Sequence, residues 1–182
     1  MKKQIFLVLL LMLVVSACGA QTQPVTGSFA GRVEGSDAFI GLVRNGDQMM
    51  TYYCDGTAET TPVLWGWFRG ELNGSAFDLT NENGDHLIGE FNADGASGTI
   101  TLAGGSALNF LAEPVSQPAG LYRHQETVEG AEAVAGWIVL ANGEVRGGKQ
   151  GGSQLISATN KPTGWVDPDV EPVRWVEPDV EP

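Results

Sequence analysis

Histidine and cysteine, which supply most transition-metal ligands, are scarce in this sequence. It has two of each among 182 residues, and His86 and His124 form neither an H-x-x-H nor an H-E-x-x-H spacing. No serine lies in a G-x-S-x-G turn, and only those two histidines are present to serve as its base. We therefore expect no metal site, no cofactor and no catalytic residue.

Basic residues are also few. Lys and Arg together number 10 against 22 Asp and Glu, which gives a formal net charge of −12 at pH 7. A chain this acidic is repelled by phosphate backbones, and no basic stripe with interleaved aromatic residues offsets that repulsion. We expect no nucleic acid among its partners.

Long apolar runs are absent except at the N-terminus. Lys2 and Lys3 precede the eleven apolar residues from Ile5 to Val15. A membrane-spanning helix needs about 20 residues, so this run is too short to cross a bilayer. A positive start, a short apolar run and small residues are instead typical of a secretory signal, so we expect residues 1–17 to be a signal peptide.

The sequence Val15-Ser16-Ala17-Cys18 resembles the lipobox of bacterial lipoproteins. The resemblance implies that acyl chains such as palmitate are attached through Cys18 and that the signal is removed. Two or more acyl chains hold a protein stably on a membrane. The resemblance thus implies a lipid anchor on the bacterial cell membrane, facing the periplasm or the exterior, with the outer membrane as one location. Residues 18–27 would form a lipidated tether, and the alternative is an ordinary secreted protein cleaved nearby.

Cys54 is the second cysteine, and lipid on Cys18 would leave it without a partner for an intrachain disulfide. An unpaired cysteine of this kind is usually buried and behaves as a small apolar residue. We expect Cys54 to be buried and unreactive.

Glycine is abundant, with 25 residues, and much of it falls in turn pairs. Asn-Gly and Asp-Gly pairs readily take the positive φ that tight hairpin turns require. They occur at residues 45–46, 55–56, 73–74, 83–84, 94–95 and 142–143. Regularly spaced turn signals with short strands between them indicate an antiparallel meander.

Apolar and polar residues alternate between these turns, as in Phe77 and Leu79 or Ile100 and Leu102. We predict an all-β fold, with about eight strands at residues 28–34, 38–44, 48–54, 62–72, 75–81, 86–92, 97–103 and 107–112. Strand edges must be paired or covered, so the meander is expected to close as a small barrel over residues 28–112. A two-sheet β-sandwich is the alternative.

The segment VLWGWFRGEL, residues 63–72, is apolar on both faces. Trp65 and Trp67 share one face, while Leu64 and Phe68 share the other. We expect another element to pack on its outer side, and the candidate is an appended β-hairpin module at residues 119–149. An apolar ligand site at the barrel mouth, lined by Trp65 and Trp67, is a second interpretation.

From the sequence pattern of residues 119–149 we predict a strand at 120–127, then a short turn or helical stretch, and then a hairpin. The segments GLYR and GWIVL-ANG resemble a piece that recurs in uncharacterised secreted bacterial proteins, and this resemblance implies no activity. The glycine-rich run at residues 147–152 is expected to act as a hinge.

Residues 150–182 combine a flexible glycine linker with a repeat. WVDPDVEP at 165–172 returns as WVEPDVEP at 175–182, with seven of eight positions identical. Prolines exclude helix and favour an extended chain, and the acids favour a disordered, solvated tail. The functional interpretation is a bivalent ligand in which Trp165 and Trp175 bind a partner groove.

Two near-matches to known sites each fail at a required position. Residues 143–149 fit G-x-x-x-x-G-K, but Gln150 stands where a P-loop needs Ser or Thr, and no helix is expected after it. Asn81 and Asn83 match positions of a calcium loop, but Leu79 replaces its first Asp and strands flank it. We expect a hairpin turn at Asn83.

Three functions remain open from the sequence. The first is a membrane-anchored, non-catalytic lipoprotein that binds a protein or another cell-envelope partner through its body or its acidic tail. The second is binding of a small apolar ligand in the barrel mouth. The third is a hydrolase, for which His124 with Arg123 and Glu126, or a pair of carboxylates, would be the candidates. A filled barrel favours the first function, an internal cavity the second, and a cleft with a His–acid–Ser cluster the third.

Overall fold

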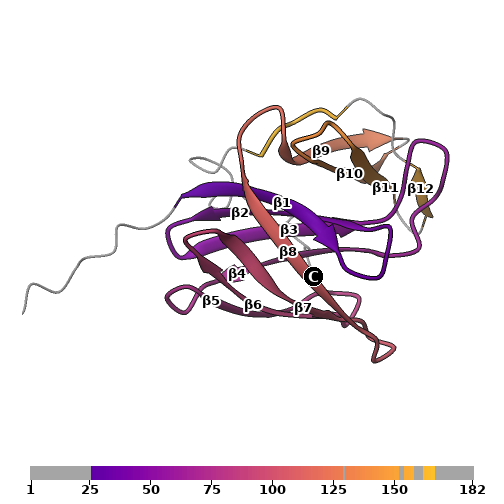
Figure 1. The fold of residues 1–182 in the computed structure, drawn as a ribbon. Coiled ribbons are helices and arrows are strands. Elements are labelled where there is room, and N and C mark those ends of the chain that lie inside the picture. The colour runs from indigo at the N-terminus through magenta and orange to yellow at the C-terminus, as the bar shows by residue number, and fades with distance from the viewer. Residues whose placement is uncertain (1–25, 129, 152–153, 158–161, 167–182) are drawn as a thin grey trace, which may run out of the picture.

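The computed structural model describes residues 26–128, 130–151, 154–157 and 162–166. All regular secondary structure in these residues is β, which confirms the predicted fold class (Figure 1). The strands are β1 Gly27–Val33, β2 Phe39–Asn45, β3 Gln48–Cys54, β4 Trp65–Glu71, β5 Ala76–Thr80, β6 His86–Asn92, β7 Gly95–Thr101, β8 Ala107–Val115, β9 Gly120–Val128, β10 Ala131–Val139, β11 Val145–Gly151 and β12 Gln154–Ser157.

The turn glycines place the first eight strands close to where the sequence predicted them. Gly46, Gly74 and Gly84 have φ values of 59°, 68° and 81°, which only glycine adopts at no steric cost. The predicted bounds of β3 and β6 match the observed ones, and most other ends differ by one to three residues. β8 is longer than predicted, because it continues to Val115.

Strands β1 to β8 form one antiparallel sheet in the order β4-β3-β2-β1-β8-β7-β6-β5. β1 pairs with β8 along all but its first residue, from Ser28 opposite Val115 to Val33 opposite Phe110. The two outer strands, β4 and β5, follow each other in the chain and meet through side chains, because a Cβ built on Gly70 would lie 2.3 Å from Leu79 Cδ2. The sheet is therefore nearly closed as a barrel, as predicted.

The barrel interior is filled by apolar side chains. Inward-pointing residues from all eight strands join one cluster, which includes Phe29, Leu42, Phe68, Leu87 and Ile100. Phe91 contacts two other aromatic rings of this cluster, with ring centroids 5.0 Å from Phe29 and 5.4 Å from Phe77. This packing favours a structural barrel over one that encloses a ligand.

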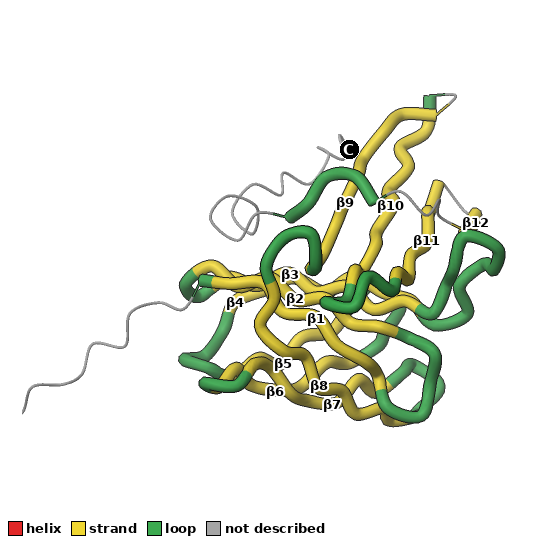
Figure 2. The backbone as a smooth tube through the Cα atoms, turned by 45° about the horizontal axis from the view of Figure 1, so that its top comes forward, coloured by secondary structure: helices red, strands yellow, loops and turns green. Residues whose placement is uncertain are grey.

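Strands β9 to β12 form a second antiparallel sheet in the order β12-β11-β10-β9, and it covers the outer face of β1 to β3 (Figures 1 and 2). A second apolar cluster lies between the two sheets, with Phe39, Met50 and Tyr52 on the barrel side and Leu121 and Ile138 opposite. β2 and β3 are consequently buried on both faces.

Glycines bring the two sheets into close contact. A Cβ built on Gly136 would lie 2.5 Å from Trp67 Cζ2 and 2.8 Å from a Tyr52 ring carbon. A Cβ on Gly148 would lie 2.6 Å from Pro62. The inter-sheet packing therefore requires the glycine-rich sequence of β10 and β11.

The predicted hinge at residues 147–152 is wrong. Residues 145–151 form β11, which pairs with β10 from Val139–Val145 to Ala133–Gly151. Gly147 and Gly148 lie where bulky neighbours leave no space for a Cβ, so packing rather than flexibility explains these glycines. The hairpin module at 119–149 is accordingly part of a four-stranded sheet that also contains β12, which falls inside the region predicted as linker.

Candidate functional site

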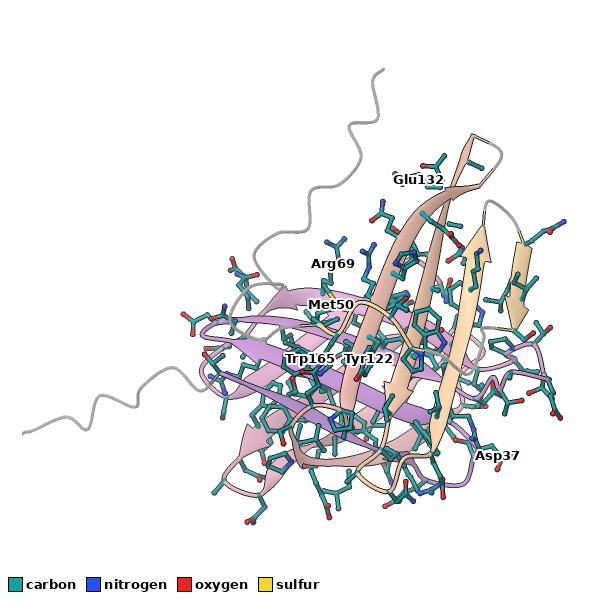
Figure 3. The ribbon with its side chains drawn as sticks, turned by 90° about the horizontal axis from the view of Figure 1, so that it is seen from above. Asp37, Met50, Arg69, Tyr122, Glu132 and Trp165 are labelled. Carbon is teal, nitrogen blue, oxygen red and sulfur yellow. The ribbon has the colours of Figure 1, made fainter. Side chains whose placement is uncertain are left out.

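The predicted site residues are distributed unevenly over the structure. Cys18 and Trp175 lie outside the described residues. Trp165 is described and lies against β9, next to Tyr122 (Figure 3). Trp65 and Trp67 are partly buried against the cluster between the sheets.

Trp65 and Trp67 therefore point away from the barrel interior, and a ligand inside the barrel would face Leu64 and Phe68 instead. Trp67 stacks on Tyr52 with ring centroids 4.3 Å apart. This placement favours a structural role for these indoles in holding the second sheet over the interpretation of them as the lining of the barrel mouth. The prediction that another element packs on this outer face agrees with the contact to Gly136.

The contact that depends most strictly on residue type is made by Gly120 to Arg123 of β9, which we call the docking site. It holds the docking segment, Gly164 to Val166, at the open edge of the second sheet. Arg123 N donates to Gly164 O across 2.7 Å, and Val166 N donates to Leu121 O across 2.9 Å. Tyr122 and Trp165 form an antiparallel bridge between these two bonds. The docking segment thus extends the sheet by β-augmentation.

Alternation along the docking segment sends its two apolar side chains to opposite faces. Val166 is 2% exposed and belongs to the cluster between the sheets, with Leu121 and Ile138. Trp165 lies on the outer face, against a small cluster that contains Tyr122 and Trp137. The pair Trp-Val is therefore held by two separate apolar surfaces.

The indole of Trp165 is held closely at its nitrogen edge. A Cβ built on Gly120 would lie 3.0 Å from Trp165 Nε1 and 3.8 Å from Ser28 Cβ. Trp165 Nε1 and Ser28 Oγ are both buried without a hydrogen-bond partner. The Tyr122 hydroxyl donates to Pro118 O across 2.8 Å, which fixes the ring that Trp165 packs against.

Gly164 meets the strictest steric demand in the docking segment. Its φ is +72°, in the left-handed region that favours glycine. A Cβ built there would lie 2.1 Å from the Arg123 carbonyl oxygen, which is a backbone atom and cannot rotate away. The docking site therefore requires glycine immediately before its tryptophan.

The residues considered for a hydrolase do not form a catalytic cluster. His124 and Glu126 lie on one face of β9, whereas Arg123 lies on the other, with its guanidinium 5.9 Å from the centre of the Trp67 ring. The hydrogen bond from Lys149, at 2.5 Å, lowers the pKa of Glu126. Among the described residues, no three His, Cys, Asp or Glu side chains are placed to hold a metal ion.

Both near-matches to known motifs adopt ordinary β structure. The run that resembled a P-loop continues into β11 as a strand. Asn81 and Asn83 lie in the β5–β6 turn, and Asn81 Oδ1 accepts from Asp85 N across 2.8 Å. Within the ranges that the structure describes, neither region has the helix that its motif would need.

Asp85 is a buried carboxylate that the sequence analysis did not identify. It is 5% exposed, and its oxygens accept from the Tyr53 hydroxyl at 2.6 Å, from Asn81 Nδ2 at 3.1 Å and from Ala103 N at 3.0 Å. Burial, reinforced by the hydrogen bond to Asp85, raises the pKa of Tyr53. This network closes one end of the barrel and leaves no carboxylate oxygen without a partner, so we assign it a structural role.

Arg44 closes the other end of the barrel. It is 7% exposed, and it donates to Gly46 O at 2.9 Å and to Gly74 O at 3.0 Å, which joins two turns. Its guanidinium also lies 5.2 Å from the centre of the Phe91 ring. Burial lowers the pKa of Arg44, as expected for a cation held away from water.

Cys54 is fully buried, as predicted, and its sulfur accepts a hydrogen bond from Gly56 N at 3.4 Å. Burial raises the pKa of its thiol to about 11. A neutral, inaccessible thiol is a poor nucleophile.

Two shallow hollows flank the turn after β10. They have volumes of about 420 and 370 Å³, and they share the apolar residues Val115, Leu140 and Ala141. Both lie outside the barrel, beside its β1–β8 face and the loop before β9.

No helix in the described part of the chain has the length and apolar character of a membrane span.

No protein-family model, curated protein or solved structure matches this chain.

Proposed function

We propose that this protein is a lipid-anchored, non-catalytic surface protein that binds a protein partner of the cell envelope through its acidic repeat. The anchor would be Cys18, and residues 18–27 would be the tether to the β-barrel body. The filled barrel and the dispersed His124, Arg123 and Glu126 support binding rather than catalysis or storage of a ligand.

The observation that carries this proposal is the position at which the tail leaves the body. Ser28, near the start of β1, and Trp165, in the docking segment, both approach Gly120. The end of the tether and the beginning of the repeat therefore lie at the same end of the molecule. A tail that starts beside the tether would be delivered close to the membrane surface.

The chemistry of the repeat defines the partner it suits. Its prolines pre-order an extended chain, so less conformational entropy is lost on binding. Its tryptophan suits a deep apolar pocket, as indoles do at binding hot spots. Its acids suit a basic groove and should make binding weaken as salt is added. We therefore expect the partner to be a protein with an apolar pocket inside a basic groove.

Site-specific photo-crosslinking in living cells would test this function. A photoreactive amino acid at position 175 is expected to give one discrete adduct, which disappears when Glu177→Gln, Asp179→Asn and Glu181→Gln are combined. The same amino acid at Val63, which is 83% exposed on the body, is the matched control and should give no such adduct. Absence of an adduct at 175, or an adduct that does not depend on the acids, would contradict the proposal.

A further inference from the structure

The two copies of the repeat differ at a position where the docking site restricts the side chain. The similarity between them extends back to Pro162 and Pro172, which gives PTGWVDPDVEP for the first copy and PVRWVEPDVEP for the second. Glycine precedes the tryptophan in the first copy, and Arg174 precedes it in the second. The other two differences are Thr for Val and Asp for Glu.

Arg174 does not fit the docking site in the register of the first copy. A Cβ at the Gly164 position would lie 2.1 Å from the carbonyl oxygen of Arg123, and Gly164 O itself accepts the hydrogen bond from Arg123 N. Moving the chain away to make room would therefore break one of the two backbone bonds that hold it. The left-handed φ of +72° is a second obstacle, because side chains disfavour it.

We propose that the docking site accepts the first copy and excludes the second, so that residues 175–182 alone are the ligand for the partner. Trp165 and Val166 of the first copy would then be part of the body rather than half of a bivalent ligand. This replaces the interpretation of Trp165 and Trp175 as two equivalent anchors. The assignment of the second copy to the partner rests on the proposed function, whereas the selectivity of the docking site does not.

The selectivity has a functional consequence for the repeat. Without it, two nearly identical copies would compete for one docking site, and each molecule would expose either copy at different times. With it, every molecule holds Trp165 and presents Trp175. The residue before the tryptophan in each copy, Gly164 or Arg174, decides which of these two behaviours the chain shows.

Indole N–H signals in ¹⁵N NMR of the intact chain would test the selectivity. The Trp165 and Trp175 signals are assigned by Trp→Phe substitution, and their exchange with water reports burial. In the unsubstituted chain we expect Trp165 to be protected and Trp175 to exchange rapidly. Gly164→Arg should remove the protection of Trp165 without protecting Trp175, and Gly164→Ala should do the same with a smaller side chain.

The second copy offers a test that leaves the docking site intact. Arg174→Gly should protect part of the Trp175 population at the expense of Trp165. Combining it with Gly164→Arg should transfer the protection to Trp175. Protection of Trp175 in Gly164→Arg alone, persistent protection of Trp165 there, or no effect of Arg174→Gly would overturn the proposal.

The partner is then examined separately by crosslinking. We expect the adduct from position 175 to persist in Gly164→Arg and in Trp165→Ala. In the double variant the adduct from 175 should fall and one from 165 should appear. If the NMR pattern holds but neither position gives an adduct, the selectivity stands and the proposed function fails. If both positions give equal adducts in the unsubstituted chain, the assignment of one copy to the partner fails.

Discussion

Tyr53 donates its hydroxyl to Asp85 Oδ2 across 2.6 Å, and this bond joins the end of β3 to the turn that begins β6. Both residues are almost completely buried, with exposures of 1% and 5%. The bond therefore connects two strands that are not neighbours in the sheet, in an environment from which water is largely excluded, where an unpaired polar group is destabilising.

We expect Tyr53→Phe to reduce the free energy of unfolding by about 1–3 kcal/mol, because Asp85 loses a hydrogen bond where water replaces it poorly. Chemical denaturation at pH 7 measures the change. The matched control is Asp78→Ala, which removes the contact to His86 at 2.7 Å with Asp78 75% exposed. That surface pair should contribute between about 0 and 1 kcal/mol. Equal effects of the two variants would contradict the structural role of Asp85.

Because the two sheets are in close contact at Gly136, we expect a larger side chain there to lower the free energy of unfolding. Gly136→Ala places a methyl group against Trp67 and Tyr52, whose rings are already stacked, so overpacking should cost about 1–3 kcal/mol of unfolding free energy. Gly104→Ala is the matched control, since a Cβ there meets no atom within 4 Å. Thermal unfolding of both variants compares them. An unchanged melting temperature for Gly136→Ala would mean that the second sheet is not packed as described.

We expect truncation of the valine in the docking segment to lower stability more than truncation of an exposed valine on the body. Val166→Ala removes a side chain that is 2% exposed in the cluster between the sheets, and we expect a loss of about 1–3 kcal/mol. Val63→Ala removes one that is 83% exposed and should change stability by less than about 0.5 kcal/mol. Denaturant titrations of the two variants test this. Similar small effects would show that residues 164–166 do not stabilise the body.

Cys54 predicts a loss of stability at alkaline pH. Burial raises its pKa from 9.0 to about 11, so the folded state favours the neutral thiol. Its stabilising contribution is complete below pH 9 and is lost as the pH rises through about 11, at about 1.4 kcal/mol per pH unit between those values. Denaturation series from pH 8 to 11 should be less steep for Cys54→Ala, which lacks this group. Identical slopes would contradict the burial of the thiol.

The lipid anchor is predicted to depend on Cys18 alone. Cys18→Ser should abolish incorporation of a labelled fatty acid and leave an unlipidated precursor, because no other residue is expected to carry the acyl chains that stable attachment needs. Cys54→Ala retains the other thiol and should incorporate label normally. Lipid labelling that persists in Cys18→Ser would remove the assignment.

The strands were predictable because their determinants are local. Turn pairs such as Asn83-Gly84 need positive φ, and Gly84 has it. Alternation placed Phe77 and Leu79 on one face of their strand, and both join the interior cluster, with Phe77 buried and Leu79 partly buried. Closure between β1 and β8 followed from the need to pair exposed edges, which is a general constraint rather than a local signal.

The second sheet and the docking site were harder to predict because they depend on contacts between distant segments. A glycine at position 147 or 148 has the same local signature whether it bends freely or lies under a bulky neighbour. Asp85 follows a turn glycine, where solvent exposure is the ordinary expectation, and only the fold brings Tyr53 to it. The difference between Gly164 and Arg174 was visible in the sequence, but its meaning required the position of the Arg123 carbonyl.

The pairing of β1 with β8 has a consequence for how the chain matures. Ser28 lies opposite Val115, so one side of the first strand stays without its partner until almost the whole barrel sequence has been synthesised. The outer faces of β2 and β3 wait longer, because their apolar cover comes from Leu121, Ile138 and finally Val166. Folding during synthesis is therefore incomplete until the chain has been made as far as Val166. Addition of the docking segment, rather than of the first hairpins, sets the moment at which the body becomes protected from proteases and from aggregation.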